Sequence, residues 1–375
     1  MEQQPLADGG TTQDIIPGLP DDLALRCLAK ISHGYHGMLE CVSKIWRNAL
    51  RSRDYSNLKA TEGWCGNWLF VSTNVESKCQ WDAYDPDADR WHPLPRLCRE
   101  NLEGHSGFSC VSICKRFLVI GGFYVQGIKK QTTNDVTMFD PFMKQWSRVS
   151  SMRTMRTDFA CAVICGKVYV AGGSNSNCTG GLAAAEVYDP HLDRWEDLPP
   201  MPYPLIKCFS ISHGNQFHVA GKKESNIEQD SYFIYDPVGQ RWQIVTDLWP
   251  FSKLSRRYTT VADGLIYTIL EDGTIKVIYP NSRDWSTLGV LPAVLLPEHA
   301  RPLKPFGFYL IGFKWYLYVL GSKILKYDSN THAFDVVLLN ATKCCDPKNM
   351  PLEWQDVRPM PRPCGSILGC ASMEE

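Results

Sequence analysis

A short pattern of apolar and polar positions recurs along most of this chain. In each copy an apolar strand runs into a Tyr/Phe-Asp-Pro turn, or a reduced form of it, and an aromatic residue closes the copy a few positions later. The closing aromatics lie 43 to 55 residues apart. A period of roughly fifty residues with several short strands in each unit is typical of a propeller blade rather than a helical solenoid. The six copies read AYDPDADRW (83–91), MFDPFMKQW (138–146), VYDPHLDRW (187–195), IYDPVGQRW (234–242), VIYPNSRDW (277–285) and KYDSNTHAF (326–334).

Further apolar runs predict the other strands of each blade. Ahead of the turn, a strand ends in glycine, as in FLVIGG (117–122), KVYVAGG (167–173) and QFHVAGK (216–222). In the turn, proline fixes φ and aspartate can bond its own downstream backbone, and the closing aromatic is expected to fill the gap between neighbouring blades. Blades four to six have lost the double glycine, and the fifth also lacks the aspartate of the turn.

The end of the chain supplies a strand that the first unit lacks. The segment CGSILGCA (364–371) resembles the opening strands FSCVSICK (108–115) and FACAVICG (159–166), and no such strand precedes WLFVST (68–73). Because an open ring leaves unpaired strand edges, we expect residues 364–371 to form the innermost strand of the first blade. The prediction is a mainly β fold with a six-bladed propeller over residues 67–375.

Residues 15–53 follow a different period. Leu23, Cys27, Leu28 and Ile31 lie on one helical stripe, and the stretch VSKIWRNALRSR (42–53) predicts a second helix. A helical piece of this size buries too little apolar surface to be stable by itself, which points to docking on another protein. The alternative is that the helices pack on the propeller as an N-terminal cap. We expect residues 1–14 to be disordered and residues 54–66 to be a short connector.

Composition narrows the choice of partner and compartment. The chain has 39 basic and 40 acidic residues, so no broad basic field attracts nucleic acid or anionic lipid, and neither is an expected partner. The N-terminus lacks the basic start and apolar run of a secretory signal, and no apolar stretch is long enough to span a bilayer. We therefore expect a cytoplasmic or nuclear location, where the 15 cysteines are reduced thiols.

The repeat, with its double glycine, Tyr-Asp-Pro and tryptophan, resembles the kelch-repeat family. The leading segment, with Leu-Pro-Asp-Asp-Leu (19–23) and Cys-Val-Ser-Lys-Ile-Trp-Arg (41–47), resembles an F-box. An F-box followed by kelch repeats is an arrangement familiar from plants. The resemblance implies binding to a Skp-type adaptor and, through it, to a cullin–RING ubiquitin ligase. Carried over by position, the adaptor-binding residues are Leu19, Pro20, Leu23, Leu28, Val42, Ser43 and Trp46. The link SHGYHGM (32–38) departs from the usual apolar, proline-bearing form of the family.

Candidate chemistry in the propeller is sparse. On a strand, residues four apart are roughly 13 Å from each other, so Cys110 with Cys114, or Cys161 with Cys165, cannot share one metal or form a disulfide, and we interpret all four as core residues. No catalytic, metal-binding or cofactor-binding motif is present. Loops at one end of the propeller, residues 123–134, 174–184 and 222–231, are candidate target-binding segments. The arginines beside the innermost strands are candidate ligands for target carboxylates, with strand capping or pairing to neighbouring acids as the alternative: Arg153, Arg156, Arg256, Arg257 and Arg362.

The expected function is that of a non-catalytic substrate receptor. The helical module attaches to the adaptor, and the propeller loops capture an unidentified target protein for ubiquitination. Two alternatives remain open: an adaptor-bound scaffold or signalling protein that directs no degradation, and a propeller metallo-oxidase, which requires converging metal ligands that the sequence does not show.

Overall fold

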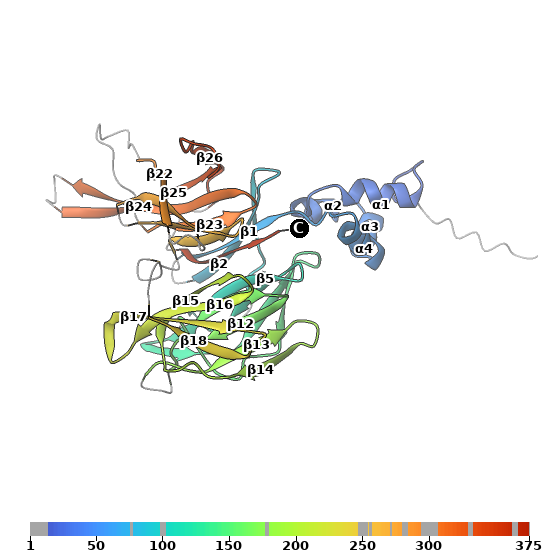
Figure 1. The fold of residues 1–375 in the computed structure, drawn as a ribbon. Coiled ribbons are helices and arrows are strands. Elements are labelled where there is room, and N and C mark those ends of the chain that lie inside the picture. Colours follow the sequence, from blue (N-terminus) through green and yellow to red (C-terminus); the bar gives the residue numbers. More distant parts are fainter. Residues whose placement is uncertain are drawn as a thin grey trace, which may run out of the picture. The chain divides into compact units, whose positions relative to one another are not determined.

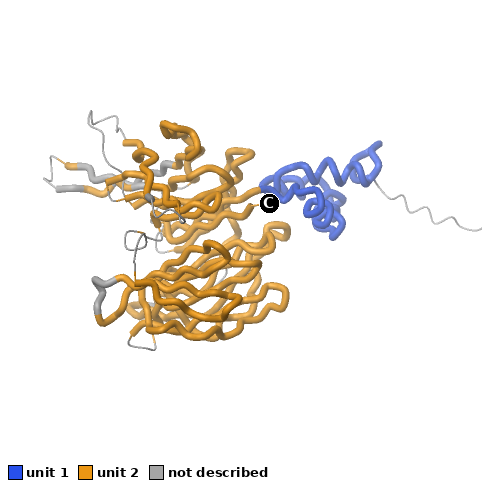
Figure 2. Tube along the Cα trace, viewed as in Figure 1, with its two compact units in different colours: residues 1–66, 375 blue, residues 67–374 orange. Residues whose placement is uncertain are grey.

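The computed structural model describes residues 14–75, 78–97, 103–176, 180–246, 254, 257–270, 272–279, 284–293, 307–328, 333–361 and 367–374. These residues fall into two compact units that divide between Gly66 and Asn67 (Figure 2). The disorder expected for the N-terminus falls on residues outside this description, apart from Asp14.

The first unit is helical. It contains α1 (Asp21–Ala29), a 3₁₀ turn (His33–Tyr35), α2 (His36–Leu39), α3 (Lys44–Leu50) and α4 (Arg53–Thr61). Serine side chains cap two of the helices: the Ser43 hydroxyl accepts the Trp46 N–H at 3.0 Å, and the Ser52 hydroxyl accepts the Tyr55 N–H at 3.1 Å. Leu28, Ala29, Leu50 and Tyr55 form its buried centre.

Residues 54–66 are not a connector, because α4 belongs to this core. Tyr55 is 1% exposed and its hydroxyl lies 3.2 Å from the Leu28 carbonyl oxygen. The Lys59 side chain is also fully buried, and its ammonium donates to the carbonyls of Ile31 at 2.8 Å and Trp64 at 3.0 Å. The fourth helix supplies the apolar surface that the shorter predicted module lacked.

Within the described residues, the second unit contains six four-stranded antiparallel sheets, the blades of a propeller, which confirms the predicted fold class (Figure 1). The first three blades, written from the innermost strand outward, are β27 (Ile367–Met373), β1 (Trp68–Val75), β2 (Lys78–Asp85) and β3 (Arg90–Pro93); β5 (Ser109–Ile113), β6 (Arg116–Ile120), β9 (Val136–Asp140) and β10 (Gln145–Val149); and β11 (Ala160–Ile164), β12 (Lys167–Ala171), β13 (Ala185–Asp189) and β14 (Arg194–Leu198).

The fourth to sixth blades follow the same order. They are β15 (Ile206–His213), β16 (Gln216–Lys223), β17 (Asn226–Asp236) and β18 (Arg241–Val245); β19 (Thr259–Ala262), β20 (Leu265–Ile269), β21 (Thr274–Tyr279) and β22 (Asp284–Val290); and β23 (Tyr309–Phe313), β24 (Tyr316–Asp328), β25 (Ala333–Cys345) and β26 (Gln355–Val357). An additional three-stranded sheet contains β4 (Glu103–Ser106), β7 (Phe123–Gln126) and β8 (Lys129–Thr132).

The ring is closed by the C-terminal strand. β27 pairs with β1, with Met373 opposite Trp68 and Cys370 opposite Val71. The strand spans residues 367–373 instead of the expected 364–371, and residues 364–366 lie outside the description. β27 also lies beside both β5 and β23, so the innermost strands form a continuous circle.

Aspartate holds the repeated turns, and tryptophans tie the first four blades to the blades that precede them. The carboxylates of Asp85, Asp140, Asp189 and Asp236 accept the backbone N–H two residues downstream at 2.8 to 3.1 Å. The tryptophan indoles then donate to carbonyls of the preceding blade: Trp91 to Arg358, Trp146 to Pro95, Trp195 to Ser150 and Trp242 to Pro199, at 2.7 to 2.8 Å.

The sixth copy of the repeat was assigned to the wrong segment. KYDSNTHAF lies at the end of the long β24–β25 hairpin, where Tyr327 pairs with Phe334 and Asp328 with Ala333. The blade's turn is instead formed by Asp346, whose carboxylate accepts the Lys348 N–H at 2.9 Å, and Trp354 donates to the Val290 carbonyl at 3.3 Å. Eight positions separate Asp346 from Trp354, two more than in the other copies, and this insertion hid the true repeat.

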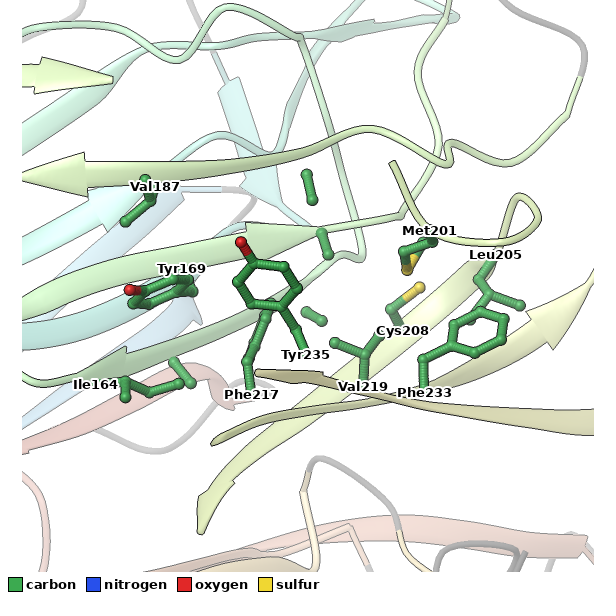
Figure 3. Packing of buried hydrophobic residues seen from close by; sticks show 14 residues of the cluster. Ile164, Tyr169, Val187, Met201, Leu205, Cys208, Phe217, Val219, Phe233 and Tyr235 are labelled. Atoms are coloured by element: carbon green, nitrogen blue, oxygen red, sulfur yellow. The ribbon is translucent and has the colours of Figure 1, made fainter. Parts of the chain in front are cut away.

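The core fills the spaces between blades, and the glycine pairs allow the close approach. Figure 3 shows the cluster formed by the third and fourth blades, in which Tyr169 lies near Phe217 and Tyr235. A Cβ on Gly172 would lie 2.7 Å from the Cys208 Sγ, and one on Gly173 would lie 2.5 Å from the Thr157 carbonyl oxygen. Both positions therefore exclude a larger residue.

Two of the four cysteines interpreted as core residues are exposed. Cys114 and Cys165 lie in the hairpin turns after β5 and β11, with φ of 50° and 48°, and only Cys110 and Cys161 lie on the strands. Within the described residues, no helix has the length and apolar character needed to cross a membrane.

Candidate adaptor and target surfaces

Large apolar side chains are exposed on the helical unit. Leu23 on α1 is 45% exposed, Met38 on α2 is 56% exposed, and Val42 before α3 is 61% exposed. Pro20, at the start of α1, is exposed as well. A domain that leaves such side chains in water offers apolar surface for another protein to cover.

The remaining predicted adaptor residues shape the unit more than they line its surface. Leu28 is 1% exposed and belongs to the core. Ser43 caps α3, and the half-buried Trp46 packs on the core while its indole donates to the Ile15 carbonyl at 2.7 Å. Leu19 is half-buried, and its N–H donates to the Ile16 carbonyl at 3.0 Å. Met38 was missed because it belongs to the link (32–38), which does not match the form usual in the family.

That link is filled by buried histidines. His33 and His36 are 3% and 2% exposed, and their ring centroids are 4.1 Å apart. The His36 Nε2 lies 2.7 Å from the Tyr55 hydroxyl, and burial raises the pKa of Tyr55, so this phenol stays protonated. Buried imidazoles thus stand in the link that is apolar in the usual form of the family. Through Tyr55, α4 is bonded to the first half of the module.

In the second unit, backbone hydrogen bonds gather the candidate loops at one end of the blades. Gly122 N–H donates to the Arg156 carbonyl at 2.9 Å, Thr157 N–H to Ser174 at 2.8 Å, and Gly173 N–H to Leu205 at 3.0 Å. Loops that follow second strands are thereby joined to loops that precede the next innermost strands, across the second to fourth blades.

The predicted arginines do not form one exposed cluster where the structure describes them. Arg156 is 0% exposed and pairs with the equally buried Glu186 at 2.5 Å, while its guanidinium also donates to the carbonyls of Gly172 and Ala184. Burial lowers the pKa of Arg156 and the Glu186 carboxylate opposes that shift, so the guanidinium remains charged. Glu186 also accepts the N–H groups of Arg153 and Thr154, so the group fixes the loop between blades.

The other arginines do not converge. The Arg153 side chain is exposed and pairs with Asp197 on the outermost strand β14 at 2.5 Å. Arg257 is exposed, and its carbonyl accepts the Leu310 N–H at 2.7 Å. Arg256 and Arg362 lie outside the described residues. Strand capping and acid pairing, the alternative left open by the sequence, account for Arg153 and Arg156.

A cavity of about 290 Å³ runs along the axis between the six innermost strands. One level of it is formed by matched positions of the blades: Cys370, Cys110, Cys161, Ser210, Thr259 and Leu310. The Ser210 hydroxyl bonds the backbone N–H and carbonyl of Cys161, both at 2.8 Å, and links two blades. Burial raises the pKa of Cys370 well above its ordinary value, so its thiol is protonated and a poor nucleophile.

Comparison with known proteins agrees with this architecture. The F-box domain model matches residues 16–56, and the kelch motif model matches residues 104–153 and 155–202. The chain is 48% identical to F-box/kelch-repeat protein At1g16250 of Arabidopsis thaliana, across 97% of this chain and 98% of the relative. The chain belongs to the F-box/kelch-repeat family. The predicted family is thereby confirmed.

More distant members and a solved structure support the same assignment. F-box/kelch-repeat protein SKIP30 of Arabidopsis thaliana is 27% identical across 97% of this F-box/kelch-repeat protein and 98% of its own length. The solved structure of YjhT has a TM-score of 0.53 and 13% identity, covering 76% of this chain and 96% of its own, which is a likeness of fold. An F-box implies a Skp-type adaptor as partner, and its combination with kelch repeats suggests a receptor of the substrate-binding, non-catalytic kind.

Proposed function

We propose that this protein is the substrate-recognition subunit of a Skp–cullin–F-box ubiquitin ligase, working in the cytoplasm or nucleus. The helical unit binds the adaptor, and the loop end of the propeller captures the target protein. The chain itself performs no chemistry; it raises the local concentration of target lysines near a ubiquitin-charged enzyme elsewhere in the complex.

The exposure of Leu23, Met38 and Val42 is the observation that carries the proposal. The unit has a core of its own, formed by Leu28, Leu50 and Tyr55. The exposed side chains named above are therefore not needed for that core. When the adaptor covers these exposed side chains, each Å² of apolar surface removed from water contributes about 25 cal/mol to the free energy of binding.

Co-purification with the adaptor tests the first half of the proposal. The double substitution Leu23→Asp with Val42→Asp places charges in the contact, and we expect recovery of the adaptor to fall by about tenfold or more. Trp46→Asp is a poorer probe, because the Trp46 indole is bonded to the Ile15 carbonyl and its loss also disturbs the fold.

The matched control is Leu192→Asp in the turn between β13 and β14. Leu192 is 64% exposed, similar to Val42, but lies on a blade. The Leu192→Asp variant should therefore recover the adaptor as well as the unmodified protein does. If the double variant also binds the adaptor normally, the assigned contact is wrong.

Target abundance tests the second half. Proximity labelling under proteasome inhibition identifies candidate targets, whose levels are then compared in cells with and without the protein. A rise on its removal supports the ligase role. Unchanged levels and unchanged ubiquitination of every labelled protein would instead favour an adaptor-bound scaffold.

A further inference from the structure

The additional sheet β4–β7–β8 shares no strand with the six blades and has a firmly held base. The His105 ring stacks on Tyr124 with centroids 4.2 Å apart, and its Nε2 lies 2.8 Å from the Gly121 carbonyl oxygen. Tyr124 is 5% exposed. The Thr132 hydroxyl accepts the Ser176 N–H at 3.0 Å, which ties the end of β8 to the neighbouring loop. A surface built on this base loses little conformational entropy when it binds.

The tip of the β7–β8 hairpin carries an isoleucine, Ile128, whose side chain is fully exposed and does not contribute to the core. Gln126 pairs with Lys129, so Gly127 and Ile128 form a two-residue turn, and Gly127 supplies the positive φ of 62°. Ile128 is 100% exposed, and no atom beyond the adjoining residues lies within 4 Å of the position that a Cβ on Gly127 would take. Polar residues and glycine are the usual choice in such a turn.

The isoleucine is followed by two exposed lysines, Lys129 and Lys130. In the part of the chain that the structure describes, no ion pair involves either of them, whereas Arg153, Lys167 and Lys222 each pair with a carboxylate. The Lys130 ammonium lies 4.8 Å from the centroid of the Phe123 ring. Glu103, the only acidic residue in the sequence of these three strands, is on the opposite edge strand, β4.

We propose that the β7–β8 hairpin binds an acidic segment of the target protein that also carries apolar side chains. Ile128 is the apolar anchor, and Lys129 and Lys130 pair with carboxylates beside it. The idea rests on the proposed receptor function and names the chemistry of its target. Nucleic acid fits less well, because two lysines neutralise few phosphates and the net charge of the chain is −1.

Selection from a library of random peptides tests this directly. The bait is the full-length protein in complex with the adaptor, with counter-selection on the variant Ile128→Ser, Lys129→Glu, Lys130→Glu. We expect the enriched peptides to combine Asp or Glu with aliphatic or aromatic residues. Measured by fluorescence anisotropy, the best peptide should bind Ile128→Ser alone and Lys129→Glu with Lys130→Glu about tenfold more weakly each, and should bind more weakly as salt is raised.

Val238→Ser and Lys144→Glu are the matched controls. Val238 is 95% exposed and Lys144 is partly exposed, both in turns between outer strands, and their loss should leave peptide binding unchanged. All variants should still co-purify with the adaptor, which shows that the receptor assembly is intact.

Four results would overturn the inference. Enrichment of peptides without an acidic excess, or no enrichment over the triple variant, removes the proposed chemistry. Equal binding of an oligonucleotide and the acidic peptide would indicate charge alone. Self-association of the lysine variants without loss of peptide binding would mean that the lysines only protect an edge strand. In each case retained adaptor binding leaves the proposed function standing, whereas lost adaptor binding in the unmodified protein would count against that function.

Discussion

At the scale of single residues, the buried pair of Arg156 and Glu186 is the clearest case of a charge used for structure. Removing one partner leaves an uncompensated charge in the core, so Arg156→Met and Glu186→Gln should each lower the free energy of unfolding by about 3 to 5 kcal/mol. Urea denaturation followed by tryptophan fluorescence measures the loss. Arg194→Met breaks an exposed pair with Glu196 and should cost about 1 kcal/mol or less. Equal losses at both sites would contradict the structural role.

The same scale contains a pH-sensitive group, His218 on β16. Burial lowers the pKa of His218 from 6.5 to about 4, with the charge of His213 as a smaller cause, and its Nδ1 is bonded to the Tyr232 hydroxyl. Between these two pKa values, His218 is mostly protonated in the unfolded chain and mostly neutral in the folded chain. Stability should fall as the pH drops from about 6.5 to about 4, by about 3 kcal/mol in total from this group.

Denaturation midpoints across that pH range measure the effect. His218→Gln removes the titrating group and should flatten the profile. His213→Gln should leave most of the slope in place. A profile as steep in His218→Gln as in the unmodified protein would assign the pH dependence to other groups.

At this scale the sequence indicated which residue types matter and where they lie, but it did not show which residues they interact with. It singled out Arg156 from its place before an innermost strand, but the carboxylate that pairs with it, Glu186, is 30 residues away. Leu28 and Val42 likewise look equivalent in the sequence, and only packing against α4 shows that the first is core and the second is surface.

At the scale of elements, the tryptophan of each outer strand is the joint between blades, and the sixth blade tests it. Trp354→Ala removes the packing of this side chain against the buried cluster of the fifth and sixth blades together with the bond to Val290, and should destabilise the propeller by about 3 kcal/mol. Tyr327→Ala changes a half-exposed side chain near the end of the β24–β25 hairpin and should cost less than about 1 kcal/mol. Thermal unfolding of the two variants compares them. The reverse order would restore the original assignment of the sixth repeat.

The elements were predictable where the local pattern was strong. Four Asp-Pro turns and their tryptophans, the glycine pairs and the general position of the closing strand all follow from the sequence, because each depends on contacts that recur at a fixed spacing. The helix α4 and the sheet β4–β7–β8 were not predicted. α4 is polar apart from Tyr55, Leu58 and Ala60, and the sheet's register is set by contacts such as His105 with Tyr124 that no repeat contains.

At the scale of the whole molecule, the proposed adaptor-binding and target-binding surfaces lie on two units with separate cores. Closure of the ring decides whether the second unit, the propeller, can fold. Deleting residues 367–375 removes β27 and with it the buried side chains of Ile367, Cys370 and Met373, and leaves the edge of β1 unpaired. We expect the propeller to lose its cooperative unfolding transition and the protein to aggregate. The helical unit keeps Leu28, Leu50 and Tyr55 in its core, so adaptor binding should persist in the soluble fraction.

Calorimetry and adaptor co-purification on the same preparation separate the two outcomes. Deletion of residues 374–375 alone spares β27 and serves as the control, and a synthetic peptide of residues 367–373 added to the truncated protein should restore part of the transition by filling the vacant strand position. An undiminished transition after the long deletion would show that the ring is held by blade-to-blade packing and the tryptophan bonds without the closing strand. Loss of adaptor binding along with the propeller would show that the helical unit depends on the rest of the chain, and the division of labour between adaptor and target surfaces would then need to be redrawn.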